Sequence, residues 1–357
     1  MIKKECFTAE WIEQVSSELH YNDKNLIEKV IRALSLLEML VKAGCPLVFK
    51  GGTALMLILG KSAHRLSIDI DLICPPGTNI EDYLKSFADF GFINLELVER
   101  KQRDDADIPK SHSKFFYQIA YRNDTDAQSY ILLDVLYEDI HYFRTQQIAI
   151  NCPFIRLEGK PLMVTVPSAE DILGDKLTAF APNTTGIPYY RNGRSCSMEI
   201  AKQLSDVGRL FENLSDLQIT KEAFRKIAVV ELSYRSFGTD IGQVFNDIRQ
   251  TALCISTRGK AGEGDFDLIQ DGIIRVKSFM YKQRYLIDHA IIDAARAAYL
   301  ATLIEKGINE IESYSNNPAD IKDMVIRPSL PNKLNKLRSN LPEAYYYWAK
   351  TSELLEA

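Results

Sequence analysis

The stretch VFKGGTALMLILGKSAHRLSIDIDLI, Val48 to Ile73, decides the fold that we expect for this chain. A short apolar strand ends in a Gly-Gly turn, Thr53 to Leu59 follows as a short helix, and Leu66 to Ile73 alternates as a second strand. Asp69 and Asp71 stand two residues apart in that strand, so both carboxylates project from one face. The order strand, glycine turn, helix, strand and Asp-x-Asp predicts a binding site.

The paired carboxylates are suited to bind a divalent cation, and the glycine turn is suited to bind phosphate, so the two features fit different parts of one ligand. Two facing carboxylates repel each other unless a cation lies between them, and hard oxygen ligands favour Mg²⁺ or Mn²⁺. Gly51 and Gly52 have no Cβ atoms, so the backbone can approach a ligand closely, and the N–H groups of the helix that Thr53 starts suit phosphate. Each feature alone is common on ordinary turns and solvated strands, but together they indicate a nucleotide with a divalent cation.

Asp134 is a third candidate carboxylate, in the apolar strand pattern YILLDVLYED. A carboxylate inside an apolar strand costs free energy unless it has a partner. A metal ion held by Asp69 and Asp71 would be such a partner. The alternative is that Asp134 reaches solvent at the end of its strand.

Two lysines are candidates for contacts to phosphate. Lys176 in AEDILGDKLTAF emerges on an apolar helical face, where it reaches toward phosphates, extends its amine to solvent, or pairs with Asp171 or Asp175. Lys202 and Asp206 stand four residues apart, which is also the spacing of an ordinary ion pair on a helix surface.

The elements in chain order predict an α+β domain followed by a helical bundle. Strand patterns end before about residue 215, and the segments after it have helical spacing. We therefore expect one domain over residues 1–218, built on a mixed sheet, and a helical domain over residues 219–357. Apart from the opening stretch, the expected helices and strands are Asn25 to Lys42, Ile93 to Glu99, Phe115 to Tyr121, Tyr130 to Tyr137, Val164 to Val166, the helix PSAEDILGDKLTAF and Glu199 to Leu214.

The composition is that of an ordinary globular protein, with 357 residues, 46% hydrophobic and 25% charged. A net charge of −5, from 43 basic and 48 acidic residues, gives no general attraction to nucleic acid and leaves only local basic surfaces. The six cysteines show no CxxC pair, so we expect neither a zinc site nor disulfides. Neither the segment MIKKECFTAEWIEQ nor any other has the apolar run of a signal peptide or membrane span, so we expect a cytoplasmic protein without membrane contact.

Residues 30 to 215 resemble the AbiEii/AbiGii toxin family, which belongs to the DNA polymerase β-like nucleotidyltransferase superfamily. The resemblance rests on KGGTAL, on RLSIDIDL, on the strand aspartate Asp134 and on GDKLTAF around Lys176. The pattern R-x-S-x-D-x-D carries most of it. KQLSDVGRLF is a looser version of a further family motif, which the resemblance carries onto Lys202 and Asp206.

The resemblance implies transfer of a nucleoside monophosphate from an NTP to an acceptor hydroxyl by two-metal catalysis with Mg²⁺ or Mn²⁺. It implies a polymerase β-like nucleotidyltransferase domain, here residues 1–218. The implied metal ligands are Asp69, Asp71 and Asp134, and the implied catalytic residues are these three with Lys176 and Asp206. The implied nucleotide-binding residues are Gly51, Gly52, Thr53, Arg65, Ser67, Lys176 and Lys202.

The resemblance also implies partners. Some relatives are toxins of toxin–antitoxin or phage-defence systems, so the resemblance implies a toxin of a type IV toxin–antitoxin or abortive-infection system with a cognate antitoxin as a partner, and some relatives modify the 3′ ends of tRNA. Local basic candidates for RNA contact are Arg191, Arg194, Lys333, Lys336 and Arg338. Two alternatives stay open: a nucleotidyltransferase that acts on a small molecule or a protein, and a catalytically silent binding module of the same fold.

Overall fold

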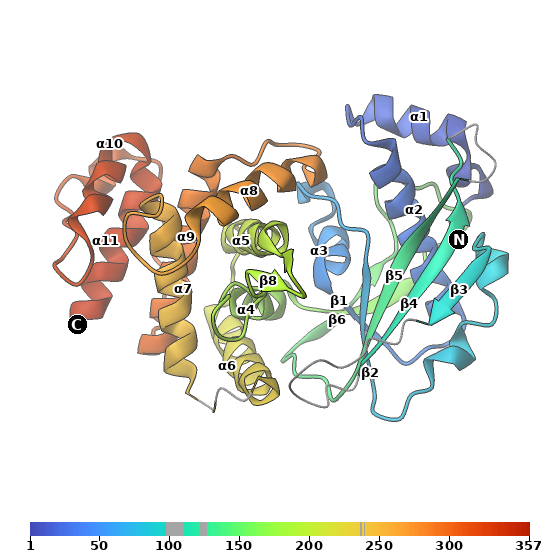
Figure 1. The fold of residues 1–357 in the computed structure, drawn as a ribbon, viewed down its shortest axis with the longest axis horizontal. Coiled ribbons are helices and arrows are strands. Elements are labelled where there is room, and N and C mark those ends of the chain that lie inside the picture. Colours follow the sequence, from blue (N-terminus) through green and yellow to red (C-terminus); the bar gives the residue numbers. More distant parts are fainter. Residues whose placement is uncertain (98–109, 122–126, 236–237, 239) are drawn as a thin grey trace. The chain divides into compact units, whose positions relative to one another are not determined.

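The computed structural model describes residues 1–97, 110–121, 127–235, 238 and 240–357 (Figure 1). By their internal contacts these residues form two compact units. The first unit joins Met1–Ser168 with Ser278–Gln283, and the second joins Ala169–Lys277 with Arg284–Ala357. Each unit therefore has its own core and is described by itself below.

Within its described residues, the first unit is built on a mixed sheet of five strands in the order β1-β2-β5-β4-β3. The strands are β1 (Val48–Lys50), β2 (Ile70–Cys74), β3 (Asn94–Leu97), β4 (Lys110–Gln118) and β5 (Gln128–Tyr137). β2 and β5 run parallel, while the other neighbouring pairs run antiparallel. A separate antiparallel pair is formed by β6 (Thr145–Ala149) and β7 (Met163–Pro167). The order places β2 and β5, which carry Asp71 and Asp134, side by side.

One face of this sheet forms the core of the first unit. In β5 the odd-numbered Ile131, Leu133 and Val135 are buried, whereas the even-numbered positions are exposed or, as at Asp134, half-buried. Because successive side chains of a strand point to opposite faces, the apolar face packs inward and Asp134 lies on the other face. The helix α2 (Lys24–Lys42) contacts β2 and β5 and buries most of its residues.

The remaining helices of the first unit are short. Thr8 caps α1 (Ala9–Glu18) by accepting from the backbone N–H of Trp11, and Asp23 caps α2 in the same way. The helix α3 (Gly51–Leu59) starts directly at the end of β1. The 3₁₀ turns are η1 (Lys4–Phe7), η2 (Gly60–Ser62), η3 (Ile80–Tyr83) and η4 (Phe87–Phe90).

A short segment from late in the sequence completes the first unit. The backbone N–H of Leu66 donates to the Phe279 carbonyl at 2.8 Å, and Tyr281 donates in turn to the His64 carbonyl at 3.0 Å. Arg65 and Met280 form an isolated antiparallel bridge. Residues 278–283 therefore hold the segment that leads into β2.

The second unit is helical, apart from a small hairpin of β8 (Tyr190–Arg191) and β9 (Arg194–Ser195) among its described residues. Its helices are α4 (Ala169–Ala179), α5 (Ser197–Phe211), α6 (Leu217–Tyr234), α7 (Ile241–Ser256), α8 (Phe266–Val276), α9 (Ile287–Lys306), α10 (Leu337–Asn340) and α11 (Pro342–Glu356). Its 3₁₀ turns include η6 (Pro318–Ile321) and η7 (Asn332–Lys336), while η5 (Lys277–Phe279) lies where the chain passes between the units. The helix α9 contacts α5, α7 and α11, and its buried alanines allow these neighbours to approach closely.

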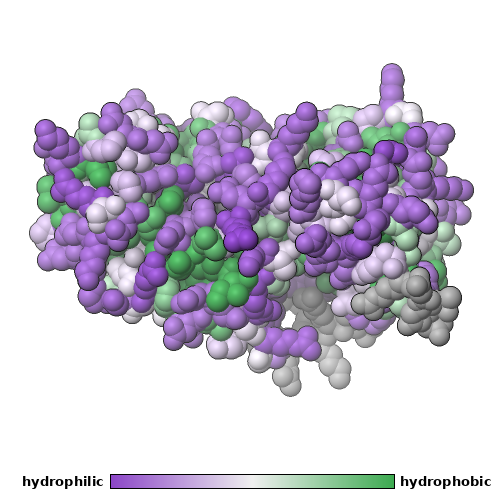
Figure 2. All heavy atoms as spheres, turned by 90° about the horizontal axis from the view of Figure 1, so that it is seen from above, coloured by the Kyte–Doolittle hydropathy of each residue, from purple (hydrophilic) through white to green (hydrophobic). Residues whose placement is uncertain are grey.

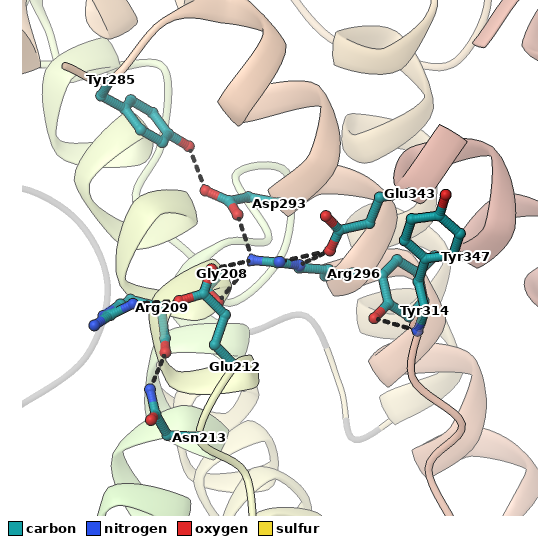
Figure 3. Close-up of polar contacts among 10 residues, drawn as sticks. All are labelled: Gly208, Arg209, Glu212, Asn213, Tyr285, Asp293, Arg296, Tyr314, Glu343 and Tyr347. Carbon is teal, nitrogen blue, oxygen red and sulfur yellow. Dashed lines mark hydrogen bonds and ion pairs between the residues drawn. The ribbon is translucent and has the colours of Figure 1, made fainter. Parts of the chain in front are cut away.

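A buried charge network joins α5, α9 and α11 around Arg296 (Figure 3). Its guanidinium donates to Glu343 at 2.9 Å, to Glu212 at 3.0 Å and to the Gly208 carbonyl at 3.2 Å. It also pairs with Asp293 at 3.3 Å, one turn earlier on α9. The network satisfies a guanidinium that is largely removed from water, and it links three helices at one point.

Asp293 is the most deeply buried carboxylate of this network. Burial raises its pKa to about 7, although Arg296 and the hydrogen bond from the Tyr285 hydroxyl, at 3.0 Å, act in the opposite direction. A Cβ atom on Gly208 would lie 1.9 Å from Asp293 Oδ1. Glycine at residue 208 therefore lets α5 approach the Asp293 carboxylate.

The predicted α+β class, with a mixed sheet followed by helices, is confirmed. The predicted strand Leu66 to Ile73 was too long at its start, because its first residue, Leu66, bonds to Phe279 and β2 begins only at Ile70. β4 begins at Lys110, five residues before the predicted Phe115, and β6 was not predicted. Of the predicted strand Ile93 to Glu99, residues 98 and 99 lie outside the described residues.

The predicted domain boundary at residues 218 and 219 falls inside the second compact unit. By packing, α4 and α5 belong with the later helices, and residues 278–283 belong with the sheet. Whether residues 1–218 act as one functional domain stays a prediction.

The surface is mainly polar where it can be followed in Figure 2. Hydrophilic residues predominate on the face drawn there, and hydrophobic residues form smaller patches among them. Among the described residues, no helix combines the length and the apolar character that crossing a membrane requires.

Candidate active site

The Gly-Gly turn lies directly against the Asp71 carboxylate. Gly51, the first residue of α3, has a φ of +78°, a conformation that residues with a Cβ atom rarely adopt. A Cβ atom on Gly51 would lie 2.1 Å from Asp71 Oδ2. Glycine is thus required at residue 51 both by the backbone turn and by the space that Asp71 occupies.

The second glycine makes room for two further candidate residues. A Cβ atom on Gly52 would lie 2.6 Å from the Ser67 hydroxyl and 2.9 Å from an Arg65 guanidinium nitrogen. Arg65 also donates to the backbone carbonyl of Leu66 at 2.9 Å. The structure therefore brings together the Gly-Gly turn and the R-x-S-x-D-x-D pattern, which the sequence separates by more than ten residues.

Thr53 links the first turn of α3 to the chain just before β2. Its buried hydroxyl donates to the Asp69 carbonyl at 2.7 Å. The hydroxyl is thus engaged with the backbone, so a contact of Thr53 to phosphate would come from its N–H group. Lys50, at the N-cap, gives this turn no side-chain hydrogen bond, and the first N–H groups of a helix have no partner within the helix.

Four side chains form a row across the sheet. Lys50 is in register with Asp71, Asp71 with Asp134, and Asp134 with His112. Residues directly opposite each other on neighbouring strands lie on one face. Asp69 lies one residue before β2, and Asp69 and Asp71 are half-buried on either side of the buried Ile70. The register thus places the carboxylate-bearing residues Asp71 and Asp134 next to each other.

Asp134 has a protein partner that the sequence did not reveal. Nδ1 of His112 lies 2.5 Å from Asp134 Oδ1, and the Asp134 side chain is 34% exposed. His112 belongs to no recognisable motif, and only the register of β4 with β5 brings it to Asp134. No signal in one sequence fixes that register.

Lys29 is a second missed residue near the site. Burial lowers its pKa, and the negative charge of Asp69 partly offsets this effect. Its Nζ lies 5.7 Å from the centre of the Tyr130 ring. A partly buried cation on α2 thus interacts with one of the candidate metal ligands.

The donor chemistry fits a hard divalent cation, although the ligands are not assembled in advance. Among the described residues, no group of three or more His, Cys, Asp or Glu side chains is arranged to hold a metal ion. Asp71 and Asp134 nevertheless offer carboxylate oxygens on adjacent strands, which are the ligands that Mg²⁺ and Mn²⁺ prefer. That Asp69, Asp71 and Asp134 bind metal stays a prediction.

Lys176 and Asp206 form a buried ion pair within the second unit. Lys176 Nζ on α4 lies 3.1 Å from Asp206 Oδ2 on α5, and both side chains are less than 10% exposed. The sequence could not indicate this partner, because it depends on how α4 packs against α5. Lys202 is half-buried on α5, one turn before Asp206. The roles of these three residues in nucleotide binding and catalysis stay predictions.

Comparisons with known proteins place these residues in a family. The model of the family described as nucleotidyl transferase AbiEii toxin, type IV TA system, matches residues 34–319. Among curated proteins no match is found.

Two solved structures are similar to this chain at low sequence identity. JHP933 from Helicobacter pylori is 15% identical, with 86% of this chain and 95% of that chain covered and a TM-score of 0.40. MenT4, a nucleotidyltransferase toxin from Mycobacterium tuberculosis H37Rv, is 13% identical, with 82% and 89% covered and a TM-score of 0.43. The family match spans well over half of the sequence, and the chain therefore belongs to the AbiEii family of nucleotidyl transferase toxins of type IV toxin–antitoxin systems.

Proposed function

We propose that this nucleotidyltransferase transfers a nucleoside monophosphate from an NTP to a hydroxyl of an RNA acceptor, with tRNA as the first candidate. The observation that carries the proposal is the register of Asp71 with Asp134, together with the Gly-Gly turn packed against Asp71. Family membership implies an NTP as the substrate and an antitoxin as a partner. The acceptor and the choice of metal go beyond what family membership implies.

The residues of the first unit have separate roles in this proposal. Asp69, Asp71 and Asp134 bind Mg²⁺ or Mn²⁺, which when bound offsets the triphosphate charge and lowers the pKa of the attacking hydroxyl. The backbone N–H groups at the start of α3, from Gly51 to Thr53, bind phosphate oxygens. Arg65 and Ser67, which pack against Gly52, supply further donors beside them.

Lys176, Lys202 and Asp206 are assigned by resemblance to the family. Lys176 and Lys202 bind the triphosphate, since a cation that contacts phosphate offsets charge that grows during the reaction. Asp206 holds the Lys176 side chain in place through their ion pair.

Two exposed arginines on the hairpin β8–β9 support the proposal that the acceptor is anionic. Arg191 and Arg194 are exposed and in register with each other, and neither forms an ion pair with a described residue. Their turn has positive φ at Asn192 (52°) and Gly193 (74°), as in a tight type I′ hairpin. Like charges directly opposite each other destabilise a hairpin. A bound phosphate group would remove this repulsion.

The other basic candidates are less suited to RNA. Lys333 donates to the Lys260 carbonyl, and Arg338 donates to the carbonyls of Ile321 and Lys322. These side chains have backbone partners within the helical unit. We therefore place the acceptor contacts on the hairpin and keep Lys336 as a secondary candidate.

The test is incubation of the purified protein with labelled NTPs, total RNA and either Mg²⁺ or Mn²⁺. We expect label in RNA with the wild type and none with the double variant Asp69→Asn, Asp71→Asn. Label that appears in RNA at the wild-type rate with the double variant would refute the metal assignment. Label that enters only a small molecule or a protein would refute the RNA acceptor.

A further inference from the structure

His112 is the fourth member of the row formed by Lys50, Asp71 and Asp134. The residue is only 8% exposed, and its Nδ1 lies 2.5 Å from Asp134 Oδ1. Its Nε2 is buried and has no hydrogen-bond partner among the described residues. The contact to Asp134 is therefore the polar contact that defines the position of this imidazole ring.

The chemistry of the pair fixes which atom donates. An ionised carboxylate has only acceptor positions, so Nδ1 carries the hydrogen and donates it to Asp134 Oδ1. The ring is buried on β4, and β4 pairs with β5 along its whole length. A rigid donor on a neighbouring strand thus holds one oxygen of a carboxylate that is still 34% exposed.

We propose that His112 is a positioning residue for Asp134. By holding Oδ1, it fixes the rotamer of the Asp134 side chain and leaves Oδ2 as the oxygen that takes up the divalent cation. This inference rests on the proposed function, because it assumes that Asp134 binds metal. Carboxylates that bind metal are themselves commonly held by hydrogen bonds, and losing such a bond typically lowers metal affinity 10- to 100-fold.

Two observations favour positioning over a purely structural role. An apolar side chain would fill a buried site on β4 without burying a nitrogen that has no described partner. In addition, the described carboxylates form no ready-made cluster of three ligands. Binding a cation then requires the ligands to be ordered, and a carboxylate that is already fixed lowers the entropic cost of that step.

The test compares three variants with the wild type in full-length protein. His112→Leu removes the donor, and His112→Asn keeps an N–H group close to the position of Nδ1. Ser111→Ala is the matched control, because it removes another hydrogen bond between β4 and β5, that of Ser111 with the Tyr137 hydroxyl at 2.7 Å. Binding of Mn²⁺ is followed by electron paramagnetic resonance, and kcat and KM for the NTP are measured in parallel.

We expect His112→Leu to raise the dissociation constant for Mn²⁺ by about 10- to 100-fold and to lower kcat more than it changes KM. His112→Asn should recover most of the affinity, and Ser111→Ala should match the wild type. In an Asp134→Asn background, His112→Leu should have no further effect on Mn²⁺ binding. If His112→Leu folds poorly, His112→Phe, which also lacks the donor, replaces it in this cycle.

Wild-type Mn²⁺ affinity in folded His112→Leu would overturn the positioning role. A further loss of affinity in the Asp134→Asn background would overturn it as well. If the wild type binds Mn²⁺ and transfers nucleotide to RNA, unchanged Mn²⁺ affinity in the His112 variants overturns the positioning role and leaves the proposed function standing. If the wild type does neither, both proposals fall.

Discussion

Gly51 is the residue at which the backbone turn and the candidate carboxylates meet. Replacing it by alanine forces a Cβ atom into a position 2.1 Å from Asp71 Oδ2, so Asp71 must move. Because a displacement of about 1 Å at a reacting centre can lower a rate about 100-fold, we expect Gly51→Ala to lower kcat/KM for the NTP by about that factor. Steady-state kinetics with labelled NTP provide the measurement.

Gly44 offers a control with the same backbone conformation. Its φ is +75°, and no atom lies within 4 Å of the position that a Cβ atom would take there. Both alanine variants should lose about 1 to 2 kcal/mol of stability from the left-handed backbone, but Gly44→Ala should keep its activity. Equal activity losses in the two variants would mean that contact with Asp71 plays no part.

The variant Lys176→Ala distinguishes two roles of the buried Lys176 side chain: an ion pair that stabilises the fold, and a contact to phosphate. Lys176→Ala leaves the Asp206 carboxylate buried without this partner, which costs about 3–5 kcal/mol of stability when a buried pair is broken. If Lys176 also binds phosphate, the loss of about 1.5–3 kcal/mol should raise KM for the NTP and lower kcat. Thermal unfolding and kinetics on the same variant distinguish them. A stability loss with unchanged kinetics would leave Lys176 a purely structural residue.

The residues that the sequence revealed and those it missed differ in a physical way. Gly51, Gly52 and Asp71 could be predicted because glycines in a turn and alternating carboxylates are local signals in one continuous stretch. His112 was missed, and the ion pair of Lys176 with Asp206 was not predicted, because these contacts depend on strand register and on helix packing. These tertiary properties leave no fixed spacing in a sequence.

At the scale of elements, the hairpin β8–β9 carries the prediction about RNA. Neutralising Arg191 and Arg194 to glutamine should weaken RNA binding and flatten its salt dependence. The log–log slope should change by about 0.7 to 0.9 for each lost phosphate contact. Fluorescence anisotropy with labelled RNA at several salt concentrations measures this slope.

The matched control removes two arginines that already have acidic partners. Arg258 pairs with Asp288 and Arg275 with Asp271, so their double glutamine variant changes the net charge equally. We expect the control to keep nearly the wild-type slope. A control slope equal to that of the hairpin variant would indicate a general charge effect, without a contact at the hairpin.

Elements were predictable where their own residues determine them. The long amphipathic helix α2 was found because its apolar residues recur at helical spacing over nineteen residues. β6 was missed because its five residues are exposed or half-buried and show no clear alternation. The start of β2 was placed too early because residues 279–281, more than two hundred positions away, pair with that segment.

At the scale of the whole molecule, the raised pKa of Asp293 predicts how the free energy of unfolding depends on pH. Its pKa is about 7 in the folded chain and near its ordinary value of 3.8 in the unfolded chain. Between these values the folded state holds a proton that the unfolded state has released. The contribution of Asp293 to the free energy of unfolding therefore falls as pH rises from about 4 to 7, by up to about 1.4 kcal/mol per pH unit.

Denaturant unfolding of the wild type and of Asp293→Asn over this pH range measures the difference. The asparagine cannot titrate, so the free energy of unfolding of the wild type, relative to that of the variant, should fall as pH rises from about 4 to 7. Parallel pH profiles for the two proteins would contradict the raised pKa of Asp293.

Toxicity is a second property of the whole molecule. Because the proposed chemistry depends on the carboxylates, expression of the wild type should arrest bacterial growth, and expression of Asp69→Ala at the same level should not. Growth curves with matched protein amounts by immunoblot provide the measurement. Equal arrest by both proteins would show that toxicity has a source other than nucleotidyl transfer.

Residues 278–283 lie late in the sequence but belong to the first unit. This affects when the first unit can finish folding during translation. The segment holding Arg65 and Leu66 has its backbone partners at Phe279 and Met280. A nascent chain cannot complete this part of the unit until Phe279 and Met280, more than two hundred residues after Leu66, have left the ribosome. A message interrupted before these residues would thus yield a fragment in which the segment that leads into β2 lacks its backbone partners.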